Sequence, residues 1–287
     1  MSLNYSELCI EELQGKSFNR ILSIDYWSVA PHFETSLEIC VRMLQLRKSV
    51  KYCFWGNIVP LSECHIHNHR VLNAQNFLHF NYPDLDFEYL DSLDSSLTLP
   101  KFPIFTHIEQ LKSYSWNALP AGISAASTVV DICKSSSPDF RDNKIRNLVL
   151  SALSSFIIAY KLTLKEISLS LPDALILFNG RYPSYAGSRY AAIQSGLSIF
   201  YHERGSVNDR FLLTKDMPHA VSEMNLRLKH SGKQLLESII SNTSSHDIYR
   251  HQWFENRIKI EPSDLDNAYK RVLGYTSQAK KKSLRIL

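Results

Sequence analysis

Two stretches of the chain show the order strand, helix, strand, and this repeated order limits the fold more than any other feature. In the first stretch, residues 20–26 and 50–55 predict strands on either side of a helix. In the second, the apolar run over 173–178 predicts a buried strand, followed by a short helix over 185–195 and a strand over 197–201. Strands joined in this way run parallel, with a right-handed crossover. The sequence therefore predicts an α/β fold in which helices flank a parallel sheet.

The remaining segments carry weaker signals. Residues 61–103 are rich in His, Asn and Asp and predict mainly loops, with a short strand near 87–90. Small residues dominate 119–132 and predict a closely packed helix. Serines and a proline at 135–139 predict the start of the longest helix, which ends before Pro172.

Composition excludes several classes of protein. The 9 glycines form neither the dinucleotide-binding nor the phosphate-loop signature. A net charge of +4 over 287 residues is too small to predict a nucleic-acid partner. The polar, acidic N-terminus is not a secretory signal, and the apolar stretch 147–160 falls short of the roughly 20 residues of a membrane span. The 5 scattered cysteines are typical of reduced core thiols, so we expect a cytoplasmic protein.

Polar and charged residues follow three of the predicted strands. They are Asp25 after the first, Asn179, Gly180 and Arg181 after the buried strand, and His202, Glu203, Arg204 and Gly205 after the last. In an open parallel sheet, ligands bind outside the carboxyl ends of the strands. We expect His202, Glu203 or Asp25 to take a proton from a hydroxyl, and Arg181 and Arg204 to hold a carboxylate or phosphate.

Each of these residues also has an ordinary structural explanation. Asn179 could cap a turn, and Glu203 and Arg204 could pair with neighbouring residues. Arg210 and His219 complete the predicted substrate-binding set, although His219 could also serve as a surface or capping residue. The run Cys64-His65-x-His67-x-His69 has the spacing of a metal cluster but also suits a polar surface loop, so no metal is expected at the site.

A family resemblance joins these features. Its main motifs are the run 172–181, which ends in the sequence FNGR, and the sequence HERG at 202–205. Further matching positions are Ala191-Ala192, Gly196, Pro218-His219, Ala121-Gly122, Tyr160 and residues 249–257. Over roughly 119–257, the chain resembles bacterial surface- and capsule-polysaccharide glycosyltransferases of the two-Rossmann-domain, GT-B-like class. The resemblance implies a Rossmann-like N-terminal domain that faces the acceptor and a C-terminal domain that binds the nucleotide-sugar.

The expected organisation follows from that resemblance. We expect residues 1–279 to form one acceptor-side domain, and 280–287 to be a basic linker or the start of a second domain. Activity would then need a second glycosyltransferase domain or chain, with a nucleotide-sugar as co-substrate and no cofactor. The expected partner is a saccharide acceptor, and Lys280, Lys281, Lys282 and Arg285 would give at most peripheral contact with the inner membrane face.

Two alternatives stay open. The chain could be a non-catalytic module that binds a saccharide or a partner protein. It could also be an unrelated α/β hydrolase or phosphatase, but it has no G-x-S-x-G motif and no clustered aspartate pair.

Overall fold

The computed structural model describes Leu13, Gly15, Ser92 and residues 18–61, 68–90, 97–204 and 211–218. The chain divides into two compact units, 1–219 and 220–287, and the second lies wholly outside the described residues. The expected domain over 1–279 and the basic segment over 280–287 therefore stay predictions.

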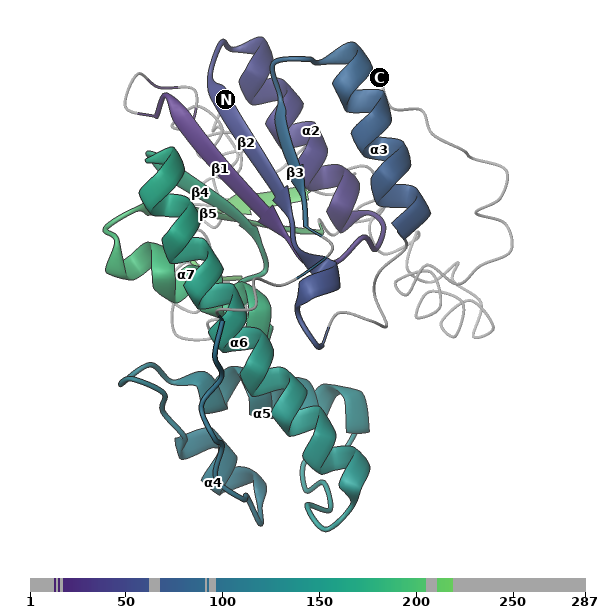
Figure 1. The fold of residues 1–287 in the computed structure, drawn as a ribbon, viewed down its shortest axis with the longest axis vertical. Coiled ribbons are helices and arrows are strands. Elements are labelled where there is room, and N and C mark those ends of the chain that lie inside the picture. Colours follow the sequence, from purple (N-terminus) through teal and green to yellow (C-terminus); the bar gives the residue numbers. More distant parts are fainter. Residues whose placement is uncertain are drawn as a thin grey trace, which may run out of the picture. The chain divides into compact units, whose positions relative to one another are not determined.

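Within the described residues, six strands form one sheet in the order β3-β2-β1-β4-β5-β6 (Figure 1). The strands are β1 (Arg20–Asp25), β2 (Ser49–Phe54), β3 (Asp86–Tyr89), β4 (Ala174–Phe178), β5 (Ser198–Arg204) and β6 (Phe211–Thr214). The first five are parallel, and β6 runs antiparallel to β5. The expected α/β, Rossmann-like sheet is confirmed.

Helices cover both faces of this sheet. The sheet is covered by α2 (His32–Gln45), α3 (Asn68–Asn81), α6 (Asn143–Ser170) and α7 (Pro183–Gln194), and a short 3-10 helix, η1 (Gly56–Ile58), follows β2. The helices α4 (Ile108–Ser113) and α5 (Ala121–Cys133) pack on α6 instead of on the sheet. Buried residues of α2 and α3, such as Phe33 and Val71, pack on one face in a core that includes Tyr52. Residues of α6 and α7, such as Leu162 and Tyr185, pack on the other face.

The direction of the chain across the sheet reverses between β1 and β4. From β1 the chain moves outward through β2 to β3, then returns through α4, α5 and α6 to β4 on the other side of β1. Ile24 pairs with Leu177, so the carboxyl ends of β1 and β4 lie side by side. Ligands of open α/β sheets bind at such a switch point.

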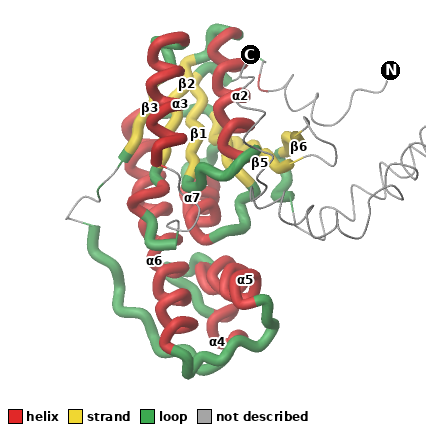
Figure 2. The backbone as a smooth tube through the Cα atoms, turned by 90° about the vertical axis from the view of Figure 1, so that its right-hand side faces the viewer, coloured by secondary structure: helices red, strands yellow, loops and turns green. Residues whose placement is uncertain are grey.

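The long helix α6 joins two cores. Its first half packs against α4 and α5 through Leu153 and Phe156 (Figure 2), and its later residues, including Leu162, pack beneath the sheet. One 18-residue window of α6 is apolar enough to cross a membrane, but 61 % of that window is buried inside the protein. Because α6 packs both on the sheet and on α4 and α5, its apolar sequence is that of a core helix.

Two local predictions are wrong. Residues 68–81 form helix α3 rather than a loop; only Val71 and Leu78 of this helix are buried, so its apolar stripe is too thin to stand out in the sequence. The long helix begins at Asn143, because Asp142 caps it by accepting a hydrogen bond from the Lys144 N–H at 2.8 Å. The serines near 135 form a turn instead, in which Ser137 N–H donates to Ser135 Oγ.

Gly187 allows α7 to approach α6 closely, and its replacement by Ala should destabilise the protein. A Cβ at this position would lie 2.2 Å from the Phe156 carbonyl oxygen, which the helix backbone holds in place. We expect a loss of about 2–3 kcal/mol in the free energy of unfolding, measured by urea denaturation. Gly196→Ala is the control, because its Cβ would meet no atom within 4 Å and only the positive φ of 70° adds strain, about 1 kcal/mol. A loss at Gly187 no larger than at Gly196 would contradict the close approach.

Candidate functional site at the carboxyl ends of β1, β4 and β5

The last predicted strand is longer than its sequence pattern indicates. Strand β6 pairs with it antiparallel, matching His202 with Leu213, Glu203 with Leu212 and Arg204 with Phe211. His202, Glu203 and Arg204 therefore belong to β5, and the prediction that they follow the strand as a loop is wrong. Their carbonyl and amide groups serve strand pairing, and the side chains of His202 and Glu203 lie on opposite faces of the sheet.

Asp25 lies at the centre of a buried polar network beneath α2. Its carboxyl group is 1 % exposed and accepts hydrogen bonds from the hydroxyl groups of Tyr52 at 2.8 Å and Tyr185 at 3.2 Å. Burial raises the pKa of Asp25 to about 7, although hydrogen bonds from Ser36, Tyr52 and Tyr185 oppose this shift. A carboxyl enclosed in this way is not placed to touch an acceptor, so the predicted role of Asp25 as a base has no support in this geometry.

His202 belongs to the same network. Its Nε2 lies 2.7 Å from Ser36 Oγ, its side chain is fully buried, and its Nδ1 has no hydrogen-bond partner among the described residues. Burial and then the neighbouring His32 lower the pKa of His202 to about 3, while Glu203 acts in the opposite direction. His202 and Asp25 thus meet through Ser36 in the interior, away from the surface where a substrate would bind.

Glu203 is the candidate base that remains accessible. Its side chain is 19 % exposed and lies 4.0 Å from His32 Nδ1. The amide of Asn179 donates a hydrogen bond to Glu203 Oε2. These two neighbours orient the carboxylate at the carboxyl end of the sheet, beside the switch point.

The turn after β4 brings the FNGR residues to this carboxylate. Asn179 adopts a φ of 56°, and its Oδ1 accepts a hydrogen bond from Arg181 N–H at 3.2 Å. Gly180 has a φ of 77°, and a Cβ there would lie 2.6 Å from the Tyr201 ring. The alternative that Asn179 shapes a turn is therefore correct, and the same side chain also binds Glu203.

Aromatic rings and a guanidinium flank the turn. Trp27 and Tyr182 lie with their ring centroids 4.2 Å apart, and both are partly exposed. The Arg181 guanidinium stacks over the Tyr182 ring at 4.8 Å, and its buried Nε has no hydrogen-bond partner among the described residues. Sequence reasoning missed this aromatic pair, although Trp27 directly follows the first strand and Tyr182 directly follows FNGR.

The predicted site residues thus fall into four groups. Asn179, Gly180, Arg181 and Glu203 come together at the carboxyl edge; Asp25 and His202 meet in the interior. Arg204 lies in β5. Gly205, Arg210 and His219 lie outside the described residues, as do Cys64, His65 and His67 of the histidine-rich run and the segment 249–257.

No protein-family model matches the chain, and no curated protein matches it significantly. Among solved structures, the chain is similar to pantoate-beta-alanine ligase from Francisella tularensis, in a complex with beta-gamma ATP and beta-alanine. The TM-score is 0.36 at 9 % sequence identity, and the similarity covers 71 % of this chain and 67 % of the ligase.

Proposed function

We propose that this chain binds a saccharide at the carboxyl ends of β1, β4 and β5, as the acceptor-side part of a glycosyltransferase of bacterial surface-polysaccharide synthesis. The observation that carries the proposal is the partly exposed Glu203 carboxylate, which Asn179 orients. The same turn carries Arg181, which stacks on Tyr182 of the Trp27–Tyr182 pair. Carboxylates accept hydrogen bonds from sugar hydroxyls, and aromatic rings present the apolar, rigid surface on which a sugar ring can stack.

In the proposed reaction, Glu203 takes the proton of the acceptor hydroxyl. The freed oxygen attacks the anomeric carbon of the donor, and the bond from that carbon to the diphosphate breaks. The nucleoside diphosphate leaves with the electron pair of that bond. Arg181 places a positive charge beside the site, which favours an anionic acceptor group. The nucleotide-sugar is a co-substrate held by a second domain or chain, and the step needs no cofactor.

Location and partners follow from the same proposal. The protein would act in the cytoplasm, and the basic residues of 280–287 would give it peripheral contact with the inner membrane face. The partners are a saccharide acceptor and the second glycosyltransferase domain, and no nucleic acid takes part.

Replacing Glu203 by Gln should weaken saccharide binding. We expect at least a tenfold rise in the dissociation constant, because the amide cannot accept hydrogen bonds at both of its terminal atoms. The measurement is isothermal titration of the full chain with a panel of bacterial polysaccharide oligosaccharides. Tyr182→Ala should weaken binding similarly by removing the stacking surface, and the exposed Glu38→Gln should leave binding unchanged. Failure of the wild-type chain to bind any oligosaccharide, or equal binding by all variants, would contradict the proposal.

Nucleotide-sugars test whether the donor binds to this chain or to a second domain or chain. UDP-, GDP- and CMP-sugars should leave the thermal unfolding midpoint of this chain unchanged if the donor binds elsewhere. A ligand at about 100 times its dissociation constant would raise the midpoint by about 5–10 °C. Such a rise with one nucleotide-sugar would place a donor site in this chain and overturn its assignment to the acceptor side.

A further inference from the structure

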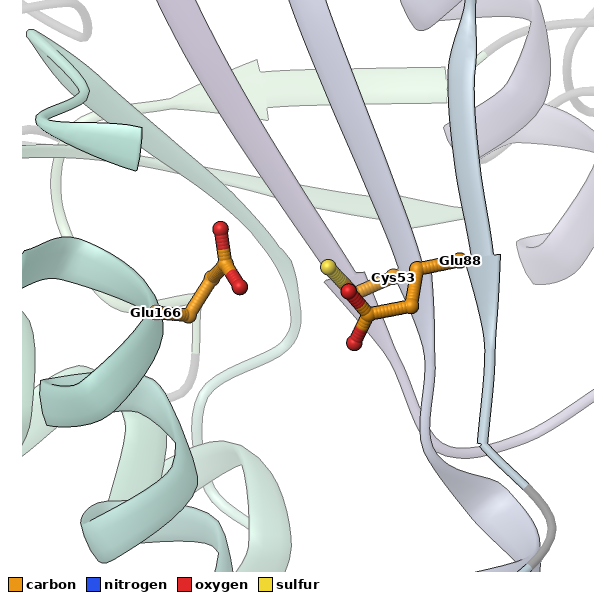
Figure 3. Close-up of side chains that lie close together, drawn as sticks. All are labelled: Cys53, Glu88 and Glu166. Atoms are coloured by element: carbon orange, nitrogen blue, oxygen red, sulfur yellow. The ribbon is translucent and has the colours of Figure 1, made fainter. Parts of the chain in front are cut away.

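Three candidate metal ligands meet in the interior, on the sheet face covered by α6. Cys53 on β2, Glu88 on β3 and Glu166 on α6 point toward one another, and one ligand atom of each lies within 4.8 Å of the others (Figure 3). Cys53 and Glu88 are paired in the parallel register of β2 and β3. Cys53 is fully buried, and Glu166 is 4 % exposed. Two neighbouring strands and a helix therefore contribute one ligand each to a largely buried site, in which only Glu88 is partly exposed.

The hydrogen bonds of this cluster leave one ligand position open. Lys51 Nζ lies 2.9 Å from Glu88 Oε2 and 3.0 Å from Glu166 Oε2, and Trp55 Nε1 donates to Glu88 Oε1 at 3.0 Å. The second oxygen of Glu166, Oε1, is buried and has no hydrogen-bond partner among the described residues. A buried carboxylate oxygen without a partner is costly, so this atom calls for a further positive group.

The charge of the cluster also leaves room for a cation. Two carboxylates and the Lys51 ammonium together carry one net negative charge in a buried place. If a divalent cation binds and the Cys53 thiol releases its proton to solvent, then the cation, the ammonium, the thiolate and both carboxylates are together neutral. Burial of a neutral group of charges is much less costly than burial of an unbalanced one.

We propose that Cys53, Glu88 and Glu166 bind a divalent transition-metal ion, with Zn²⁺ as the best chemical fit. A thiolate selects zinc over Mg²⁺ or Ca²⁺, and carboxylates complete zinc sites with water as a further ligand. Tetrahedral zinc holds its donor atoms about 3.5 Å apart, so the glutamate side chains close in by about 1 Å on binding. Lys51 and Trp55 keep their hydrogen bonds and orient the two carboxylates, as the outer partners of metal ligands do.

The ion would be structural and separate from the saccharide site. It ties β2, β3 and α6 together in the interior, whereas Glu203 and the turn after β4 lie at the carboxyl edge of the sheet. Its presence therefore does not depend on the function proposed above.

Cobalt titration of the full chain, first stripped with a chelator, tests the site. Co²⁺ bound to a thiolate gives a near-ultraviolet charge-transfer absorption, which should saturate at one ion per chain. Cys53→Ser should abolish the absorption. Cys40→Ser is the matched control, because Cys40 is an equally buried thiol that packs in the core on the α2 face of the sheet. Zn²⁺ should compete with the cobalt and raise the thermal unfolding midpoint by about 5–10 °C at 100 times its dissociation constant.

Two further variants keep the test decisive. Glu166→Gln retains Cys53 and the shape of the side chain, so it should weaken cobalt binding at least tenfold even if Cys53→Ser fails to fold. Cys64→Ser should leave the absorption intact, because Cys64 belongs to the separate Cys64-His65-x-His67-x-His69 run. Absence of cobalt binding, an absorption that survives Cys53→Ser, or one that disappears in Cys64→Ser would overturn the proposal.

Discussion

Replacing Asp25 by Asn should stabilise the protein by about 4 kcal/mol at pH 8 and leave it nearly unchanged at pH 4. The pKa of Asp25 is raised by burial from 3.8 to about 7, so the folded state holds a proton that the unfolded state releases over this range. Stability from this group is present below pH 4 and is lost as the pH rises to 7. Asn resembles the neutral carboxyl in shape and cannot ionise, so the variant escapes that loss.

His202 has the opposite effect on stability. Its pKa is lowered from 6.5 to about 3, because burial and then His32 disfavour the imidazolium. Between pH 6.5 and 3 the imidazole is therefore protonated in the unfolded state but not in the folded state, so the free energy of unfolding falls as the pH falls. In the wild-type protein the contributions of Asp25 and His202 nearly cancel between about pH 4 and 6.5, each changing by about 1.4 kcal/mol per pH unit.

Replacing either residue alone should make the pH dependence of stability visible, because the opposing contribution is then missing. In Asp25→Asn, stability should rise by about 3 kcal/mol from pH 4 to 6.5, because only the His202 contribution remains. In His202→Gln, it should fall by about 3 kcal/mol from pH 4 to 7, because only Asp25 remains. Urea denaturation across this range measures both slopes, and the exposed Asp84→Asn should follow the wild-type profile. Identical profiles for all four proteins would show that these two groups do not titrate as their burial indicates.

The strands were predictable because their signal is local. The strand pattern at 20–26 and the apolar run at 173–178 are long enough to identify a strand, and the structure places β1 and β4 within two residues of them. Pro172 and Pro183 mark boundaries that depend on backbone chemistry alone. Helix α3 lacked such a signal, because a helix that buries two residues seven positions apart has almost no apolar face.

The site was only partly predictable because its geometry depends on non-local pairing. Nothing in the segment around His202 indicates that β6 continues the strand, yet that pairing decides which side chains enter the core. Glu203 and Asn179 are 24 positions apart, and the parallel pairing of β4 with β5 brings them together as expected for two adjacent strand ends. The buried network needed Ser36 of α2, which has no distinguishing sequence signal.

Replacing Lys51 by Met should destabilise the metal-free protein by about 3 kcal/mol. The ammonium lies between Glu88 and Glu166, and its removal leaves two carboxylates facing each other with no compensating charge. The Glu166 side chain is buried, so water cannot take over the role of the lysine. Partial burial lowers the pKa of Lys51, but the hydrogen bonds to Glu88 and Glu166 and the nearby negative charge together raise it, so the ammonium is charged across the whole experimental range.

Urea denaturation with a chelator present separates this effect from bound metal. Lys134→Met is the matched control, because its pair with Asp131 has a similar separation of 2.8 Å but both side chains are exposed, so its loss should stay below about 1 kcal/mol. Adding Glu166→Gln to Lys51→Met should recover much of the stability, since the remaining Glu88 is no longer opposed by a second buried charge. A loss equal to that of Lys134→Met would mean that solvent already screens the cluster, and a double variant no more stable than the single one would mean that Lys51 acts through packing rather than charge.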